Sequence, residues 1–343
     1  MGEWVIPEPQ RTYVLELLHA LGPAAGDFVV VGAQAMKFIL ERARATKDID
    51  FVLDVLRLRG DALVLAAELE RLGYTAVEGS RNFQFEKPIP NSAETMRIEF
   101  MAPEEFKRER DFRVDVQNGV HARACTGGGI ALAESEIRQL SGRLPNGAEF
   151  AAGVRVIKPH GLVMLKLLAL DDRYRNIRGP AEARHDREEA RTHAADIIAI
   201  VSSQLDISEF REAFQCQFKS DLAIGERVSQ ILGEYFREDV SPGMLVYEEF
   251  LVADKPLDRD TRREVGQLGP HHGGPGGQTG ERGCPAVRTG GHRSPRCRRM
   301  HVSPSLWSLG GDRQCPPAYQ DRTSSSAMPL RASGPAAHRH RLH

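Results

Sequence analysis

The nine residues TKDIDFVLD, at positions 46–54, constrain the fold more than any other stretch of the chain. Apolar residues alternate there with Asp48, Asp50, Val52 and Asp54, which predicts a strand with one apolar face and one acidic face. Aspartate is disfavoured inside strands, and Asp48 and Asp50 would lie roughly 7 Å apart on one face, where like charges repel. The two carboxylates either cap turns, face solvent on an edge strand or hold a cation. Gly32 upstream and the approach through Arg44 and Thr46 favour the cation.

A junction between a strand and a helix lies just before this acidic strand. The run FVVVG, residues 28–32, reads as a short buried strand, and the helical pattern AQAMKFILERA follows directly from Gly32. The small residues Gly32 and Ala33 let the backbone approach a bulky ligand, and the N-terminus of a helix favours anions such as phosphate. The sequence therefore predicts a phosphate-binding turn next to the acidic strand.

A third carboxylate is expected beside the two aspartates. Glu99 lies among apolar neighbours in TMRIEFM, which reads as a later strand, and Asp115 in FRVDV is the alternative third acid. Carboxylate oxygens are suitable ligands for Mg²⁺ or Mn²⁺, whose charge offsets the repulsion between them. We therefore predict metal ligands at Asp48, Asp50 and Glu99. Phosphates opposite such a metal favour phosphoryl or nucleotidyl transfer, because the metal offsets phosphate charge and positions an attacking hydroxyl.

Hydrophobic periodicity divides the chain into two structured parts. Helical patterns occur at 10–21 and 61–73, and strand patterns at 28–32, 48–54, 74–79, 82–87 and 95–101. Together they predict an α/β (α+β) domain over residues 1–157. A mostly helical domain is expected over residues 158–269. Its helices are predicted at 160–173, 184–202, 207–215 and 220–237.

The composition changes near Gly269. From Pro270 to His343 there are eleven Arg, no Lys and three acidic residues, so this segment carries a net charge of about +8 and residues 1–269 carry about −9. The segment has no helical or strand period and is rich in Gly, Pro, Ser and His, which predicts a disordered tail. Arginine without lysine in such a context is also typical of GC-rich DNA read out of frame, so the tail over 270–343 is predicted to be disordered or non-native.

The remaining composition bears on location. No apolar run approaches the roughly 18 residues that a membrane span needs, and the start MGEWVIPEPQ lacks a basic region followed by an apolar one. Only Cys125 and Cys216 precede residue 270, which is consistent with a reducing compartment. The sequence predicts a cytoplasmic protein that does not contact a membrane.

The order of these motifs resembles the nucleotidyltransferase superfamily with a polymerase-beta-like palm, and within it the AbiEii/AbiGii-type toxin nucleotidyltransferases of bacterial toxin–antitoxin systems. The first motif stands here as VVVGAQAM followed by RATKDIDFVL, with Gly32, Arg44, Thr46, Asp48 and Asp50 at the positions that match. The resemblance covers roughly residues 25–202 and implies a palm-like domain followed by a helical domain, with the site between them.

A second motif strengthens the resemblance through its position. The helix segment MLKLLALDDR supplies Lys166 and Arg173, and the later segment HAADIIAI supplies Asp196. The resemblance implies catalytic roles for Asp48, Asp50, Glu99 and Lys166. It implies nucleotide-binding roles for Gly32, Ala33, Arg44, Thr46, Lys166, Arg173 and Asp196.

The resemblance also implies substrates and partners. An NTP would be the donor, a divalent metal would assist, and the nucleotide would pass to an RNA such as the 3′ end of a tRNA. A cognate antitoxin protein is the implied partner. A small molecule or a protein hydroxyl stays open as the acceptor.

Two further alternatives follow from departures and from the tail. Ala33 replaces the family's usual Gly or Ser, and His193 with two alanines precedes Asp196 where a basic residue is usual. These differences leave an inactive nucleotide- or RNA-binding member open. The basic tail leaves open a protein that binds RNA mainly through residues 270–343.

The residues of the helical domain have alternative partners. Lys166 has apolar neighbours at helical spacing, so its ammonium either meets the phosphates of the NTP or pairs with Asp196. Arg173 lies two turns further along the same face, as a phosphate or RNA contact or as a solvated helix end. His185 and His193 have no zinc-ligand spacing, and we predict that both are surface residues.

Overall fold

The computed structural model describes residues 6–254, except 42, 45, 47, 108–111, 177–178 and 205. All of these residues belong to one compact unit, Met1–Leu309. The predicted tail over 270–343 lies outside the described residues. None of the described helices combines the length and apolarity that a membrane crossing requires.

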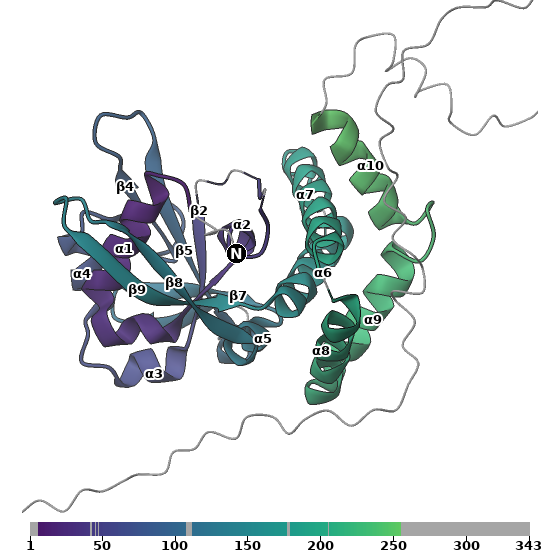
Figure 1. Ribbon diagram of the computed structural model, residues 1–343, viewed down its shortest axis with the longest axis horizontal. Helices are drawn as coiled ribbons and strands as arrows, with labels where there is room; N and C mark the ends of the chain where they lie inside the picture. The colour runs from purple at the N-terminus through teal and green to yellow at the C-terminus, as the bar shows by residue number, and fades with distance from the viewer. Residues whose placement is uncertain are drawn as a thin grey trace, which may run out of the picture. The chain divides into compact units, whose positions relative to one another are not determined.

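Strands and short helices alternate up to residue 157, and long helices follow (Figure 1). The first part contains α1 (Gln10–Leu21), the 3₁₀ helix η1 (Gly22–Asp27), β1 (Phe28–Val31), α2 (Gly32–Met36), β2 (Asp48–Leu53), α3 (Val55–Gly60), α4 (Leu65–Arg71), β3 (Thr75–Ala76), β4 (Gln84–Pro88), β5 (Thr95–Pro103), the 3₁₀ helix η2 (Glu104–Phe106), β6 (Arg113–Gln117), β7 (Val120–Cys125), α5 (Gly128–Ala133), β8 (Ser135–Arg143) and β9 (Glu149–Ile157). The second part contains α6 (Pro159–Arg175), α7 (Ala183–Ser202), α8 (Ile207–Ser220), α9 (Leu222–Tyr235) and α10 (Pro242–Asp254). The predicted fold class, an α/β domain followed by helices, is confirmed, whereas the domain boundary at 157/158 stays a prediction.

The strands form one mixed sheet within the described residues. Its order is β3-β4-β5-β2-β1-β9-β8. Strand β4 pairs with the first part of β5, and β7 pairs with the last residues of β5. Strand β6 pairs with β7. At the centre, β1 pairs antiparallel with β2, and β2 pairs parallel with β5. Because β1 is a run of buried, mostly β-branched residues, it suits this central position. The acidic strand β2 therefore lies near the middle of the sheet, not at its edge.

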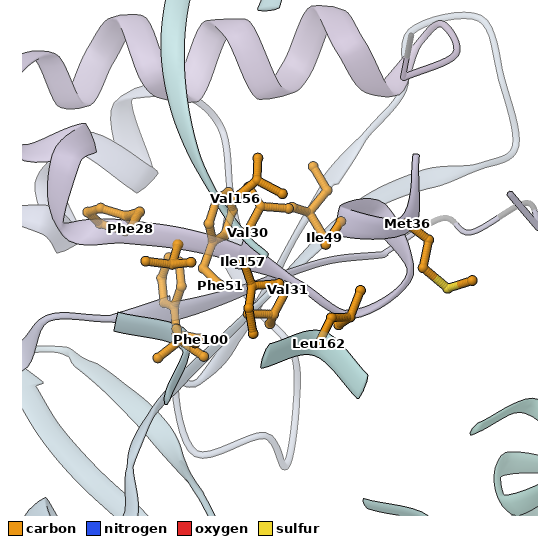
Figure 2. Packing of buried hydrophobic residues seen from close by; sticks show 14 of the residues in the cluster. Phe28, Val30, Val31, Met36, Ile49, Phe51, Phe100, Val156, Ile157 and Leu162 are labelled. Carbon is orange, nitrogen blue, oxygen red and sulfur yellow. The ribbon is translucent and has the colours of Figure 1, made fainter. Parts of the chain in front are cut away.

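One face of the sheet forms the core of the α/β part (Figure 2). The rings of Phe28, Phe51 and Phe100 contact one another edge-on or tilted, with centroids 5.8 to 6.3 Å apart, and all three side chains are fully buried. Each buried aromatic ring contributes about 1.5–3 kcal/mol relative to an exposed one. Helix α1 packs against β8 and β9. The apolar face that the alternation in 48–54 predicted is thus confirmed.

Helices α6 and α7 pack along each other and form the core of the helical part (Figure 1). Pro159 opens α6 at its first turn, where a missing N–H costs nothing. The next two helices start at capping aspartates, because Asp206 accepts backbone N–H bonds at the start of α8 and Asp221 does so at α9. Helix α6 also contacts α2 and α5, so the helical part joins the α/β part close to the start of α2.

Several boundaries differ from the sequence prediction for tertiary reasons. Helix α4 begins only at Leu65, not at Asp61, because the Leu65 N–H donates to the side chain of Gln117 on β6. Asp54 ends β2 and caps α3, a helix that the sequence analysis did not predict. Helix α2 stops at Met36, and α10 lies beyond the predicted helices.

Candidate active site

The two aspartates of β2 lie on the sheet face opposite the aromatic core. Strand pairing sets Asp50 beside Val31 of β1 and beside Glu99 of β5, and sets Asp48 beside Arg97. Directly paired residues of neighbouring strands point to the same face, so this face carries Asp48, Asp50 and Glu99 in adjacent positions. The register thus brings together the three acids that the sequence singled out.

Gly32 is required by the side chain of Asp50. Its φ is +62°, in the left-handed region that L-residues with a Cβ disfavour. A Cβ built on Gly32 would lie 2.0 Å from Oδ2 of Asp50, so the carboxylate occupies the space that any other residue would fill. The sequence analysis explained Gly32 by a bulky ligand, and the structure adds that this glycine makes room for the acid itself. Ala33 follows it as a buried residue of α2.

The electrostatic state of the two aspartates is unfavourable in the protein alone. Burial, together with the charges of Glu99 and Asp48, raises the pKa of Asp50 to about 7, although Arg123 and Lys166 oppose the rise. Burial also raises the pKa of Asp48. Within the described residues, donors and cations near these carboxylates do not offset their desolvation. A divalent cation with oxygen ligands would fit the pair.

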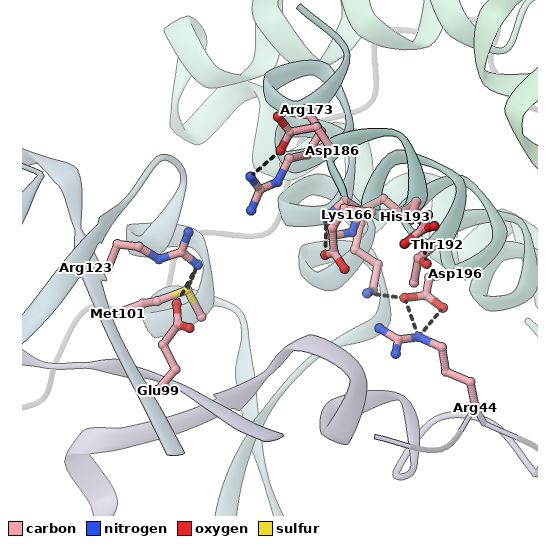
Figure 3. Close-up of polar contacts among 12 residues, drawn as sticks. Arg44, Glu99, Met101, Arg123, Lys166, Arg173, Asp186, Thr192, His193 and Asp196 are labelled. Carbon is pink, nitrogen blue, oxygen red and sulfur yellow. Dashed lines mark hydrogen bonds and ion pairs between the residues drawn. The ribbon is translucent and has the colours of Figure 1, made fainter. Parts of the chain in front are cut away.

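Glu99 differs from the aspartates because both of its oxygens have partners. Oε1 lies 2.6 Å from Nη2 of Arg123 in an ion pair (Figure 3). Oε2 accepts a 2.6 Å hydrogen bond from Nε2 of Gln84. The contact with Arg123 is close but is not aligned as a hydrogen bond. Across the part of the chain that is described, no group of three or more His, Cys, Asp or Glu side chains is arranged to hold a metal. Glu99 as a third ligand therefore stays a prediction.

The alternative third acid lies further from β2. Asp115 is on β6, which β5 and β7 separate from β2. Its carboxylate lies 3.2 Å from Nδ1 of His121, the residue that it faces in the sheet. Of the two candidates, only Glu99 is adjacent to Asp50.

Lys166 and Asp196 form a buried ion pair in the helical part. Nζ of Lys166 donates to Oδ2 of Asp196 at 2.6 Å, and both side chains are about 95% buried. The guanidinium of Arg44, from the segment between α2 and β2, donates to the same carboxylate at 3.3 and 3.4 Å (Figure 3). The pairing with Asp196 that the sequence left open is therefore present. Asp196 holds two of the cations that the resemblance assigned to the nucleotide.

The other two predicted contacts are also held by the protein. Nη1 of Arg173 lies 3.0 Å from Oδ1 of Asp186, whose side chain is fully buried, so Arg173 is not a solvated helix end. Thr46 donates through Oγ1 to the backbone oxygen of Asp48 at 3.3 Å. That bond shapes the entry into β2, and a role of either residue toward a nucleotide stays a prediction.

His193 is a residue of this region that the sequence analysis assigned wrongly. Only 17% of its side chain is exposed, whereas His185 is exposed as predicted. Burial lowers the pKa of His193 well below its usual value, and the positive charges of Lys166, Arg173, Arg44 and Arg123 lower it further. The signal was available, because His193 precedes Asp196 by three residues and so shares a face of α7 with it.

The acidic face of β2 and β5 is electrostatically coupled to a cationic cluster, which consists of Lys166, Arg173 and Arg44 with their carboxylate partners. The charge of Lys166 acts on Asp50, and that of Arg123 acts on His193. Figure 3 shows Glu99 and Arg123 on one side and Lys166, Asp196 and Arg44 on the other. The acidic face and the cations of the helical part are thus close enough to shift each other's ionisation.

Comparison with protein families gives one match. The model described as "Nucleotidyl transferase AbiEii toxin, Type IV TA system" matches residues 16–271, about three quarters of the chain, and includes both halves of the site. Curated protein sequences gave no match.

Solved structures give distant matches. A nucleotidyltransferase-like antigenic protein from Paracoccidioides brasiliensis is 14% identical with a TM-score of 0.35, and the match covers 65% of this chain and 94% of that one. The antibiotic-resistance factor ANT(2'')-Ia is 18% identical with a TM-score of 0.32, covering 63% and 97%. JHP933 from Helicobacter pylori is 10% identical with a TM-score of 0.26, covering 77% and 99%. Likenesses this distant carry no argument about substrate.

Proposed function

This chain belongs to the AbiEii family of nucleotidyl transferase toxins, and from that premise we propose that it is a metal-dependent enzyme that moves a nucleotide from an NTP to an RNA acceptor. The family is part of type IV toxin–antitoxin systems, which implies an NTP substrate and a cognate antitoxin. The metal, the RNA acceptor and the residue roles are the proposal.

The observation that carries the proposal is the state of Asp48 and Asp50. Both carboxylates lie on one strand face and have a raised pKa, which reaches about 7 for Asp50. The Asp50 carboxylate also lies close to the backbone of Gly32. We assign Mg²⁺ or Mn²⁺ to this pair, next to Glu99. When bound, the metal would offset phosphate charge and lower the pKa of an attacking hydroxyl. The two aspartates would hold it, and Gly32 would keep the Asp50 carboxylate in place.

The cationic cluster supports the assignment of the NTP. Lys166, Arg44 and Arg173 would face the triphosphate, and Asp196 would orient Lys166 and Arg44 through the bonds that it already makes. Gly32, Ala33 and Thr46 would approach the nucleotide from the start of α2 and the entry to β2. A preorganised cation at the leaving pyrophosphate stabilises the charge that grows there in the transition state.

In the proposed reaction the acceptor hydroxyl oxygen forms a bond to the α-phosphorus, and the bond from that phosphorus to the pyrophosphate oxygen breaks. Pyrophosphate leaves with the electron pair of that bond, and the hydroxyl proton passes to solvent. An RNA end such as the tRNA 3′ terminus is the acceptor that we infer from the family. This choice rests on family analogy, not on a contact in the chain.

The test is transfer from α-³²P-labelled NTPs with Mg²⁺ to three classes of acceptor. Purified tRNA, an aminoglycoside and a protein mixture would be offered separately to the wild-type protein and to Asp50→Asn. We expect label on tRNA with the wild type alone. Label on the aminoglycoside or on protein would show that the acceptor is not tRNA. NTP binding without transfer to any acceptor would favour an inactive nucleotide-binding protein, the alternative that Ala33 left open.

A matched control separates the metal site from general effects of charge. Asp54 follows β2 at the same alternating spacing as Asp48 and Asp50, yet its carboxylate accepts the Arg57 N–H and caps α3. Asp54→Asn should therefore keep transfer to within about threefold of wild type, because capping contributes to stability and not to chemistry. Equal loss in both variants would mean that the strand carries no specific site.

A further inference from the structure

Arg123 is the cation of this sheet face that contacts Glu99, and the family motifs do not explain its role. Arg123 lies on β7 opposite Met101 of β5. Its side chain passes Met101, with Nη2 3.6 Å from Sδ, and reaches Glu99 two residues away, at 2.6 Å from Oε1 (Figure 3). Diagonal contacts of this kind are within reach of a long side chain on a sheet. The arginine therefore places one positive charge directly beside the third acid.

Both oxygens of Glu99 already face a partner in this arrangement. Arg123 faces Oε1, and Gln84, the neighbour of Glu99 on β4, donates to Oε2. Only 14% of the Glu99 side chain is exposed. A divalent ion that approached Glu99 would be repelled by the guanidinium and would have to displace one of these two partners.

The charges of the face are balanced by a single divalent ion. Asp48, Asp50 and Glu99 contribute three negative charges, and Arg123 contributes one positive charge, which leaves two. Two further cations on this face do not change the count, because each is matched by an acid on its own strand or the next. Arg97 lies 3.4 Å from Glu86, and Arg113 shares β6 and its face with Asp115. One Mg²⁺ or Mn²⁺ at Asp48 and Asp50 would neutralise the face, whereas a second would leave it with an excess of positive charge.

We propose that Arg123 is a positioning residue that substitutes for a second metal ion, so that the site binds one divalent cation at Asp48 and Asp50 and Glu99 stays outside the coordination shell. This inference rests on the proposed metal site. In this proposal, Arg123 supplies the positive charge that a second metal ion would otherwise bring.

The test counts Mn²⁺ bound to the full-length protein, by electron paramagnetic resonance of free Mn²⁺ together with calorimetry. We expect one Mn²⁺ per wild-type chain. Arg123→Met should bind two, or bind one at least about tenfold more tightly, because Glu99 is released. Arg123→Met combined with Glu99→Gln should return to one Mn²⁺ with the wild-type affinity, and Arg123→Lys should resemble the wild type because the charge is kept.

Arg113→Met is the matched control. Arg113 lies directly opposite Arg123 on β6 and points to the same face, so its loss removes the same charge one strand further from Glu99. Its Mn²⁺ stoichiometry and affinity should stay within about twofold of wild type. An equal gain in Arg113→Met and Arg123→Met would overturn the proposal, because a general charge effect would explain both.

Glu99→Gln keeps the test decisive even if Arg123→Met does not fold. That variant should still bind one Mn²⁺ with an affinity within about threefold of wild type, because Glu99 is not a ligand. Loss of Mn²⁺ in Glu99→Gln, or two Mn²⁺ in the wild type, would overturn the one-metal site while the proposed function stands. Absence of any Mn²⁺ binding in the wild type, or unchanged binding in Asp50→Asn, would instead remove the proposed metal site itself.

Discussion

The acidic face of β2 and the ion-pair cluster on α6 and α7 hold buried charge in opposite states. Asp50 has a carboxylate whose pKa rises to about 7, because burial and neighbouring acids outweigh the nearby cations. Asp196 is buried as well, yet Lys166 and Arg44 both donate to it. Perturbed pKa values of this kind gather at functional sites, so Asp50 is the group whose state the proposed cation would change most.

The same contrast divides the residues that the resemblance groups together. For Asp48 and Asp50, the cations among the described residues do not offset the effect of burial. Lys166, Arg173 and Arg44 each have a carboxylate partner, so every one of them has a structural reason to be present. Mutations should therefore separate activity from stability on β2 and affect both in the helical part.

The largest effect is expected from Asp50→Asn. Removing a charged metal ligand should cost several kcal/mol of transition-state stabilisation, or about 10³-fold or more in turnover. The melting temperature should hold or rise, because a neutral side chain removes repulsion from Glu99 and Asp48. Turnover in Mg²⁺ and thermal melting on one preparation check this, and near-normal turnover of folded protein would reject the metal-site assignment.

The second effect concerns Lys166→Ala. Breaking a buried ion pair leaves Asp196 without its closest partner and should cost about 3–5 kcal/mol of stability. If Lys166 also faces the triphosphate, turnover of the folded fraction should fall by roughly 10²-fold or more. Melting temperature and turnover are to be measured on the same purified protein.

A double variant then distinguishes the two roles of Lys166. Lys166→Met with Asp196→Leu removes both charges and should recover most of the lost stability. We expect turnover to stay low, since no cation faces the phosphates. Recovery of turnover together with stability would make Lys166 purely structural and would weaken the resemblance in the helical half.

A smaller effect is expected from pH on the metal-free protein. The unfolded chain has an ordinary Asp50 pKa of 3.8, and the folded value is about 7. The folded state therefore holds more protons between these values, so the contribution of Asp50 to stability is complete below about pH 4 and is lost as the pH rises through 7. In EDTA, the melting temperature of wild type relative to Asp50→Asn should fall by about 3 °C or more from pH 5 to 8. A difference that stays constant over this range would contradict the raised pKa.

The smallest effect is expected from deleting the segment after Leu268. The described residues already form the acidic face and the ion-pair cluster, so truncation should leave turnover and melting temperature unchanged within error. Insoluble protein or a clearly lower melting temperature would show that the deleted segment is structural. Loss of RNA modification alone, with stability intact, would instead support binding of RNA through the tail.

Residue type and spacing alone determined much of this protein. Alternation in 48–54 predicted the strand and its two faces, because side chains on a strand alternate whatever surrounds it. Helical spacing predicted α1 and the helices α6 to α9, and the order of Gly32, Asp48 and Asp50 indicated the family. These signals depend only on residues that are near one another in the chain, so they can be read from the sequence.

Only the tertiary structure decided which partners the charged residues have. The parallel pairing of β2 with β5 sets Glu99 beside Asp50, and β7 brings Arg123 to the same acid. The packing of α7 against α6 buries His193, which the sequence analysis placed on the surface. These contacts join residues far apart in the chain, and their energies depend on burial and on neighbouring charge, which sequence spacing does not contain.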